Sequence, residues 1–298
     1  MWLPLQLIST VFWAGVNILD SSIVAHYEKR PFVLQWYQSF FTLSLLGLLA
    51  LLYGGLQSSW MLVLLLSGMS AYVGDALFFH MLDRIDISVV NIAWAIMTIF
   101  LAVAGYMLFG ETWSLLQMAG VVLVLSGIFL LSSSHRKIAE PRSLLLFPLL
   151  AALHTPFYIA QKAAIMGGES VMVALFWPLL ARELLAGGVP FLVPGRLKIL
   201  LQVPSRRLLS FHVLNGAVVG LFFLGVYFTA LSLQTGPVAL VSVVGNTQPF
   251  VVLFLAWILW KIVPSFASRE LLTLQAVRVK IVSFLVVFTG LALLALPQ

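Results

Sequence analysis

The chain has 298 residues, of which 62% are hydrophobic and only 9% are charged. Soluble domains carry roughly 45 to 50% apolar and about 25% charged residues, so this composition excludes a soluble protein and predicts a membrane protein. The formal net charge is +6, and the absence of cysteine excludes disulfides and thiol-based metal or redox sites.

Ten apolar segments follow one another along the chain. Each is close to the roughly 20 residues that a helix needs to cross a bilayer. Their ranges are 3–24, 35–53, 61–82, 87–109, 115–132, 144–165, 171–193, 208–231, 237–260 and 280–296. The alternation of a membrane β-barrel is missing, and the start of the chain lacks the positive region of a signal peptide. An all-α membrane protein with ten transmembrane helices is expected.

The second half of the chain resembles the first. The matching segments are His80–Leu82 with Thr229–Leu231, and Val124–Ile128 with Val287–Leu291. Each half holds five predicted helices, an odd number, so the second half must enter the membrane in the opposite orientation. We therefore expect two inverted five-helix repeats, 1–143 and 144–298, which is the organisation of many secondary transporters.

Basic residues are concentrated in every second loop. Of the 16 Lys and Arg residues, only Lys162 and Arg182 fall inside predicted helices. The others follow the odd-numbered helices: Lys29, Arg30, Arg84, Arg136, Lys137, Arg142, Arg196, Lys198, Arg206, Arg207, Lys261, Arg269, Arg278 and Lys280. The positive-inside rule makes these loops cytoplasmic and both termini extracytoplasmic. The basic charge thus reflects topology, and no nucleic-acid partner is expected.

Ionisable side chains inside predicted helices are the first site candidates, because each costs about 2.5 to 3.5 kcal/mol at the centre of a membrane helix. Asp75 shares a helical face with Tyr72 and is a candidate for binding a substrate ammonium or a proton; the alternative is a structural contact, such as a pair with His80. Arg182 is a structural or substrate-binding candidate. Lys162 is expected to extend to the membrane surface.

Neutral polar and aromatic residues predict a pocket at mid-membrane depth. Asn91, Trp94 and Thr98 lie on one face of the fourth helix. The other candidates come from the first, sixth and ninth helices: Trp13, Asn17, His154, Tyr158, Asn246 and Gln248. Packing between helices is an alternative explanation for each residue taken singly. Together they outline the kind of pocket that transporter repeats enclose. The five histidines show no metal-ligand spacing, so neither a metal nor a cofactor is expected.

Several short motifs carry a family resemblance: Phe12–Asn17, Phe109–Glu111, Ser126–Gly127, Ala230–Leu231 and Val90–Ile99. The first four resemble the EamA-type drug/metabolite transporter superfamily, and the last is similar to the fourth helix of its bacterial aromatic amino-acid exporters. The resemblance implies that Glu111 closes the fourth helix in a Gly-Glu motif with a structural role, and that the arginine of the seventh helix is structural.

Two features depart from this superfamily. Trp260 stands where its members have a glutamate at the end of the ninth helix. Its members also keep their termini in the cytoplasm, whereas the distribution of basic residues in this chain predicts the opposite orientation.

These observations favour a secondary transporter that works by alternating access. We expect a small amphipathic substrate such as an amino acid or organic amine. A lipid-linked sugar or nucleotide-linked metabolite is the alternative and would require a cluster of cations. Enzyme motifs, an ATP-binding loop and a channel filter are not found, so an enzyme is a remote alternative. A monomer in the bacterial inner membrane is expected.

Overall fold

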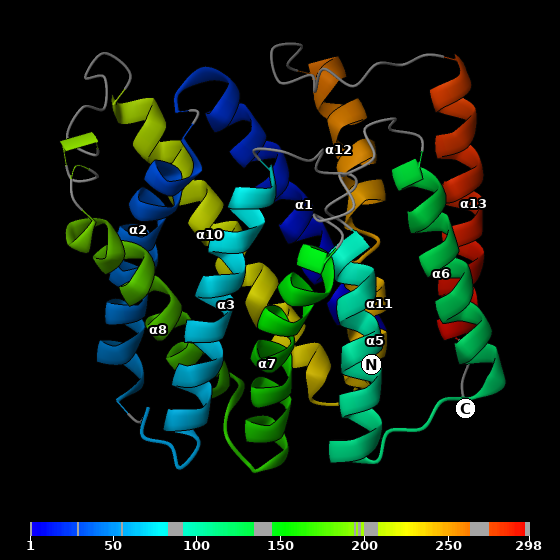
Figure 1. Ribbon diagram of the computed structural model, residues 1–298, viewed down its shortest axis with the longest axis horizontal. Coiled ribbons are helices and arrows are strands. Elements are labelled where there is room, and N and C mark those ends of the chain that lie inside the picture. The colour runs from blue at the N-terminus through cyan, green and yellow to red at the C-terminus, as the bar shows by residue number, and fades with distance from the viewer. Residues whose placement is uncertain are drawn as a thin grey trace.

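The computed structural model describes residues 2–28, 30–54, 56–82, 92–133, 145–193, 195, 198–199, 208–262 and 274–295, which form helices and turns with no strand among them (Figure 1). The all-α prediction is confirmed for these residues. The helices are α1 (Trp2–His26), α2 (Pro31–Tyr53), α3 (Met61–Leu82), α5 (Ile92–Phe109), α6 (Leu115–Ser133), α7 (Leu146–Met166), α8 (Val171–Leu192), α10 (Leu208–Leu233), α11 (Val238–Gly245), α12 (Gln248–Ile262) and α13 (Leu274–Ala295).

Every predicted apolar segment has a helix at its place, because only a helix satisfies all backbone polar groups of a single segment in lipid. Five helices are long and apolar enough to cross a membrane on their own: Trp2–Val24, Phe32–Tyr53, Met61–Phe78, Val171–Leu192 and Leu209–Leu233. Four further apolar helices are shorter. Large apolar side chains such as Leu51 and Leu192 are more than 80% exposed, which is the surface that a lipid environment requires.

Local signals set several helix ends. Pro31 occupies the first turn of α2, where its missing N–H costs nothing. Gly54 ends the same helix with φ of 56°, a left-handed conformation that glycine adopts without strain. At the start of α8, Ser170 Oγ accepts a hydrogen bond from Val173 N at 3.2 Å.

The ninth predicted segment is split into α11 and α12 by a break at Asn246 and Thr247. Pro249 lies just after the break, in the first turn of α12, where proline is tolerated. Its missing N–H prevents the hydrogen bond that would continue α11 into α12. The break exposes backbone groups in the interior of the bundle, next to α1 and α5.

The helices pack in a recurring set of pairs. In Figure 1, α6 and α13 lie side by side at one end of the molecule, and α2 and α8 lie at the other. Between these ends, α1 packs on α10 and α12, α3 packs on α7 and α8, and α5 packs on α7 and α11.

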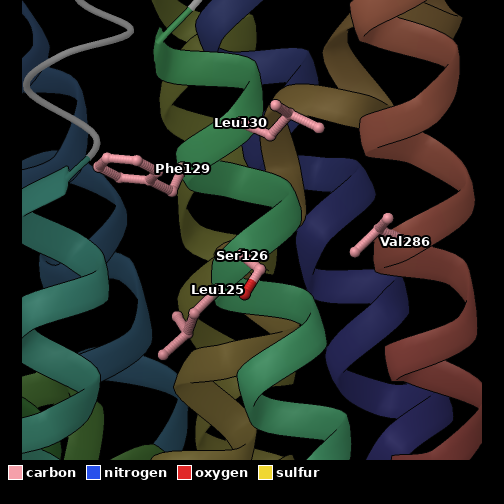
Figure 2. Close-up of a pocket in the computed structure, with 5 residues that line it drawn as sticks. All are labelled: Leu125, Ser126, Phe129, Leu130 and Val286. Atoms are coloured by element: carbon pink, nitrogen blue, oxygen red, sulfur yellow. The ribbon is translucent and has the colours of Figure 1, made fainter.

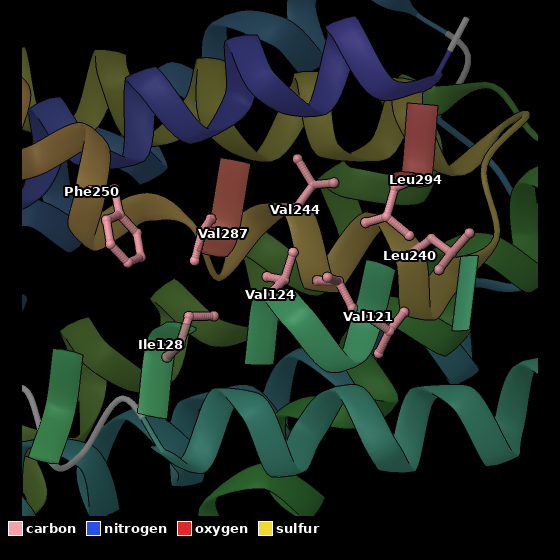
Figure 3. Close-up of a cluster of buried hydrophobic side chains, with 9 residues drawn as sticks. Val121, Val124, Ile128, Leu240, Val244, Phe250, Val287 and Leu294 are labelled. Atoms are coloured by element: carbon pink, nitrogen blue, oxygen red, sulfur yellow. The ribbon is translucent and has the colours of Figure 1, made fainter. Parts of the chain in front are cut away.

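Glycines bring α6 and α13 into close contact. A Cβ atom on Gly120 would lie 2.8 Å from the carbonyl oxygen of Gly290, and a Cβ atom on Gly290 would lie 2.7 Å from that of Gly120. Apolar side chains of α6, α11, α12 and α13 fill the adjacent core (Figure 3): Val121, Val124, Ile128, Leu240, Val243, Val244, Phe250, Val287 and Leu294. This core joins α6, from the first half, to helices from the second.

The start of α1 and the end of α13 lie at the same end of the bundle, the lower one in Figure 1. One apolar cluster lies there. It contains Leu294, and Trp2 and Trp113 pack against it.

Arg30 separates α1 from α2. Three cations predicted in the ninth loop lie inside helices instead, Lys261 in the last turn of α12 and Arg278 and Lys280 in the first turns of α13. Most of the other predicted loop cations lie outside the described residues.

We expect both termini to be extracytoplasmic, because the basic loops are attracted to the cytoplasmic side. An alkaline phosphatase fused after Gln298 should be active in cells, and a green fluorescent protein at the same place should be dark. Fluorescence from the second fusion, with an inactive phosphatase, would reverse the orientation.

Candidate functional site

The main polar cluster inside the bundle is formed by Asp75, His154, Arg182 and Glu183, and we call it the charge cluster. Asp75 on α3 accepts a hydrogen bond from Arg182 Nε on α8 at 2.6 Å. Its second carboxylate oxygen lies 3.2 Å from His154 Nε2 on α7. The remaining contact joins Arg182 Nη1 to Glu183 Oε1. Three helices are thus connected by one guanidinium, one imidazole and two carboxylates.

The side chains of Asp75, Arg182 and His154 remain between 13 and 20% exposed, whereas that of Glu183 is 4% exposed. Three of the four side chains are therefore not completely enclosed by the protein. Neighbouring residues on a helix point in different directions, so Arg182 and Glu183 are not expected to face the same partner. Only Arg182 binds Asp75. Arg182 and Glu183 also bind each other. The alternative pairing of Asp75 with His80 is wrong, because Asp75 binds His154 and Arg182 and the His80 side chain is exposed.

Aromatic rings border the charge cluster on two sides. The ring of Trp94 on α5 meets the ring of His154 edge to face, with centroids 4.9 Å apart. Phe78 lies on the other side of Trp94, at 5.9 Å. The guanidinium of Arg182 lies 4.8 Å from the ring centroid of Phe222 on α10, a distance at which a cation is attracted by the ring.

Phe222 connects the charge cluster to a second group of residues on α1 and α12. The ring of Trp13 meets Phe222 edge to face at 5.3 Å, and the carbonyl oxygen of Trp13 accepts a hydrogen bond from Gln248 Nε2 at 2.8 Å. Asn17, one turn after Trp13 on the same face of α1, is exposed. These residues lie between the two halves of the chain.

Two glycines make room for the rings of Trp13 and His154. A Cβ atom on Gly74 of α3 would overlap the imidazole of His154. A Cβ atom on Gly225 of α10 would lie 3.0 Å from Trp13 Nε1. Each ring therefore packs directly on the backbone of a helix from the other half of the chain.

The polar face of α5 finds its partners within the protein. Thr98 Oγ1 lies 2.9 Å from Ser242 Oγ on α11 and accepts a hydrogen bond from Asn246 Nδ2 at 2.9 Å. Asn246 Nδ2 also reaches the carbonyl oxygen of Trp94 at 3.2 Å. Thr98 is 1% exposed, so it holds α5 to the α11–α12 break. Asn91 lies outside the described residues.

The two tyrosines of the predicted site are half-buried at different places. Tyr72 lies on α3, one turn before Asp75. Tyr158 lies one turn after His154 on α7 and packs against the apolar cluster around Met97, Leu101 and Val238. Each tyrosine therefore lies within one helical turn of a residue of the charge cluster.

The comparison with family models matches the first part of the chain. Residues 1–133 match the model of the EamA-like transporter family. The matched part is slightly less than half of the 298-residue chain, so the match shows what this part of the chain is similar to. It supports the predicted resemblance to the drug/metabolite transporter superfamily, and together with the long apolar helices it supports an integral membrane protein.

Comparison with solved structures shows that the chain has a known fold. One crystal structure aligns with a TM-score of 0.71 over 99% of this chain and 96% of that chain, at 16% sequence identity. A likeness at this identity concerns the fold alone. No curated protein matches the sequence.

Glu111 lies just beyond α5 in the EamA-like half and contacts α11 in the other half. Its two carboxylate oxygens lie 3.0 and 2.9 Å from Val238 N, the first N–H of α11. Lys162 Nζ on α7 lies 3.1 Å from Glu111 Oε1 and donates to the carbonyl oxygen of Gly236 at 2.6 Å. The prediction that Lys162 reaches the membrane surface is wrong, because this side chain is buried and paired.

We expect Glu111→Gln to lower the free energy of unfolding by about 1 to 3 kcal/mol, because it removes the negative charge from a helix N-terminus and from Lys162. Substrate binding per folded molecule should remain unchanged. Thermal unfolding in detergent measures the first effect. Glu169→Gln serves as the control. Glu169 lies in the loop before α8 and accepts a hydrogen bond from Ser58 Oγ, and the amide oxygen of glutamine can accept the same hydrogen bond, so the stability should change little. An unchanged melting temperature with abolished substrate binding would place Glu111 in the substrate site.

Several residues near the charge cluster were not selected from the sequence. Phe222 and Ser242 are ordinary helix residues whose partners are distant in the chain. Gln161 on α7 is fully buried, and neither polar atom of its amide has a hydrogen-bond partner among the described residues. The available signal for Gln161 was an amide inside a predicted membrane helix.

A shallow groove on the outside of the protein lies between α6 and α13 (Figure 2). Its lining residues are Leu125, Ser126, Phe129, Leu130 and Val286. Phe129 is 62% exposed. The described site residues do not line this groove, which has the apolar character of a lipid-facing surface.

Proposed function

We propose that the chain is a ten-helix secondary transporter that moves a small amphipathic substrate by alternating access between two inverted five-helix repeats, 1–143 and 144–298. The similarity of residues 1–133 to the EamA-like transporter family supports a transporter. In this proposal α1, α2, α3, α5 and α6 correspond to α7, α8, α10, α11–α12 and α13, so that ten segments cross the membrane. We further propose that a monomer functions in a bacterial inner membrane.

The helix pairs support this correspondence. When each helix is exchanged for its counterpart, the α1–α10 pair becomes α7–α3, the α3–α8 pair becomes α10–α2, and the α5–α7 pair becomes α12–α1. The α2–α8, α5–α11 and α6–α13 pairs each join a helix to its own counterpart, so the exchange leaves them unchanged. Packing of Trp13 on Gly225 and of His154 on Gly74 follows the same exchange. Two halves related by a pseudo-two-fold axis would give this set of contacts.

The charge cluster and the rings beside it are the observation that carries the substrate class. Asp75 and Arg182 retain exposed surface of opposite charge, and Trp94 and Phe222 add apolar rings next to them. An amino acid has a matching ammonium, carboxylate and apolar side chain. A nucleotide-linked or lipid-linked substrate would require several unpaired cations, whereas Lys162 is already paired with Glu111.

Counterflow in proteoliposomes tests the proposal. Vesicles are loaded with unlabelled L-tryptophan, L-phenylalanine, a polyamine or a nucleotide sugar, and the uptake of the labelled compound is followed. We expect counterflow with an amino acid or an amine. Trp94→Ala should lower the apparent affinity about tenfold, which corresponds to about 1.4 kcal/mol, while Phe129→Ala on the outer surface should not. Counterflow with the nucleotide sugar alone would reject the proposed substrate class.

A further inference from the structure

Both ring nitrogens of His154 face hydrogen-bond acceptors. Nδ1 lies 3.1 Å from the carbonyl oxygen of Leu150, and Nε2 lies 3.2 Å from Asp75 Oδ1. A carbonyl oxygen can only accept, and a carboxylate that is bound to a guanidinium is an acceptor as well. A neutral imidazole has only one N–H. Both contacts can be hydrogen bonds at the same time only if a proton lies on each nitrogen, that is, if the ring is an imidazolium.

The balance of charges favours the same protonation state when both carboxylates of the cluster are ionised. The cluster contains two carboxylates, Asp75 and Glu183, and one permanent cation, Arg182. With a neutral His154 it would carry one uncompensated negative charge, and unpaired charge is costly inside a protein. A proton on His154 makes the cluster neutral.

Other charged groups do not supply this compensation. The helices that pack against α7 are α3, α5, α8, α10 and α11. Their titratable residues, with those of α7, are Tyr72, Asp75, His80, Tyr106, Tyr158, Lys162, Arg182, Glu183, His212 and Tyr227. Lys162 is held by Glu111, and His212 packs on Tyr37 and Phe41 of α2. His80 and Tyr106 are exposed. The groups that meet His154 directly are those of the charge cluster.

We propose that His154 and Asp75 form a proton-binding site that is occupied in this conformation, and that release of this proton is coupled to the transport cycle. The coupling rests on the proposed transport function, whereas the proton-binding site does not. Upon release, the proton leaves His154 Nε2 for water, and the N–H bond electrons remain on Nε2 as a lone pair. This lone pair then faces the carboxylate of Asp75, so attraction becomes repulsion and the contact between α3 and α7 opens.

The imidazole also touches the part of the protein that contains a helix break. Trp94 meets the ring of His154 at 4.9 Å, and the carbonyl oxygen of Trp94 accepts from Asn246 at the α11–α12 break. Movement of the imidazole away from Asp75 would displace Trp94 and disturb this hydrogen bond. Proton release at the cluster would thus alter how α5 holds the broken helix of the other half.

Nitrogen-15 NMR of histidine-labelled protein in nanodiscs tests the proton-binding site without any substrate. The signals of His154 are assigned by their loss in His154→Gln, and His80→Gln serves as the control for an exposed histidine. We expect the shifts of an imidazolium at neutral pH, and a change to a neutral ring as the pH is raised. Asp75→Asn should leave His154 neutral at neutral pH, because Arg182 then balances Glu183. A neutral His154 in the unmodified protein, or an imidazolium unaffected by Asp75→Asn, would overturn the proposal.

Proton movement in proteoliposomes tests the coupling. A pH-sensitive dye inside the vesicles is monitored while L-phenylalanine or L-tryptophan is added outside. We expect a pH change per transported amino acid with the unmodified protein and with His80→Gln, and a smaller pH change per transported amino acid with His154→Gln. Amino-acid uptake without a pH change would overturn the coupling. The absence of any amino-acid uptake would reject the proposed function and the coupling together, while the NMR result still decides the proton-binding site.

Discussion

Arg182→Met is expected to destabilise the protein by about 3 to 5 kcal/mol, the effect of removing one partner from a buried ion pair. Arg182 binds the carboxylates of Asp75 and Glu183, and without the guanidinium both remain inside the bundle with His154 as their one cation. Methionine retains most of the apolar contact with Phe222, so the loss is mainly electrostatic. Thermal unfolding in detergent, followed by circular dichroism, measures the effect.

Two further variants show whether charge is the cause. Arg278→Met removes an exposed arginine of α13 and should change the stability little. Adding Asp75→Asn and Glu183→Gln to Arg182→Met removes the unpaired carboxylates and should recover a large part of the lost stability. If Arg182→Met unfolds at the temperature of the unmodified protein, the guanidinium does not hold the charge cluster together.

Gly68→Ala is expected to cost about 1 to 3 kcal/mol or more, because a methyl group would be forced into a filled space. Gly68 on α3 packs directly on Pro178 of α8, and an added Cβ atom would lie 2.7 Å from Pro178 Cα and still closer to its carbonyl oxygen. The clash is with backbone, which cannot turn away as a flexible side chain can. We expect a lower melting temperature and a lower yield of folded protein.

Gly47→Ala provides a matched control. Gly47 lies inside α2, and a Cβ atom there would have no neighbour within 4 Å. Alanine is favoured over glycine inside a helix by about 1 kcal/mol, so this variant should be at least as stable as the unmodified protein. Equal stability of the two alanine variants would show that α3 and α8 are not in close contact at Gly68.

The helical fold could be predicted from the sequence because apolar segments of membrane-spanning length permit few other structures. The break at Asn246 and Thr247 could not be placed in the same way. Pro249 indicated an irregularity, but proline is also tolerated in kinked membrane helices. The break depends in addition on Asn246 binding to α5 and on Gln248 binding to α1, and these contacts join residues distant in the chain.

The charge cluster was only partly predictable. Asp75 and Arg182 stand out in the sequence because a charged group inside a membrane helix is costly. Their partners depend on how α3, α7 and α8 pack, so the sequence offered His80 as a partner for Asp75 where the structure has His154. Lys162 was expected at the surface because its side chain is long; the position of Glu111 beside α11 explains why it is buried instead.

Labelling of a single cysteine from each side of the membrane is the most direct test of alternating access. The chain has no native cysteine, so Asn17→Cys introduces a single thiol on the exposed face of α1 beside Trp13. Right-side-out and inside-out vesicles are treated with a membrane-impermeant maleimide. We predict labelling from both sides, with protection from both sides by a saturating amino acid that shows counterflow. Labelling from one side only, with no protection by any transported compound, would contradict a substrate path that opens alternately between the two halves.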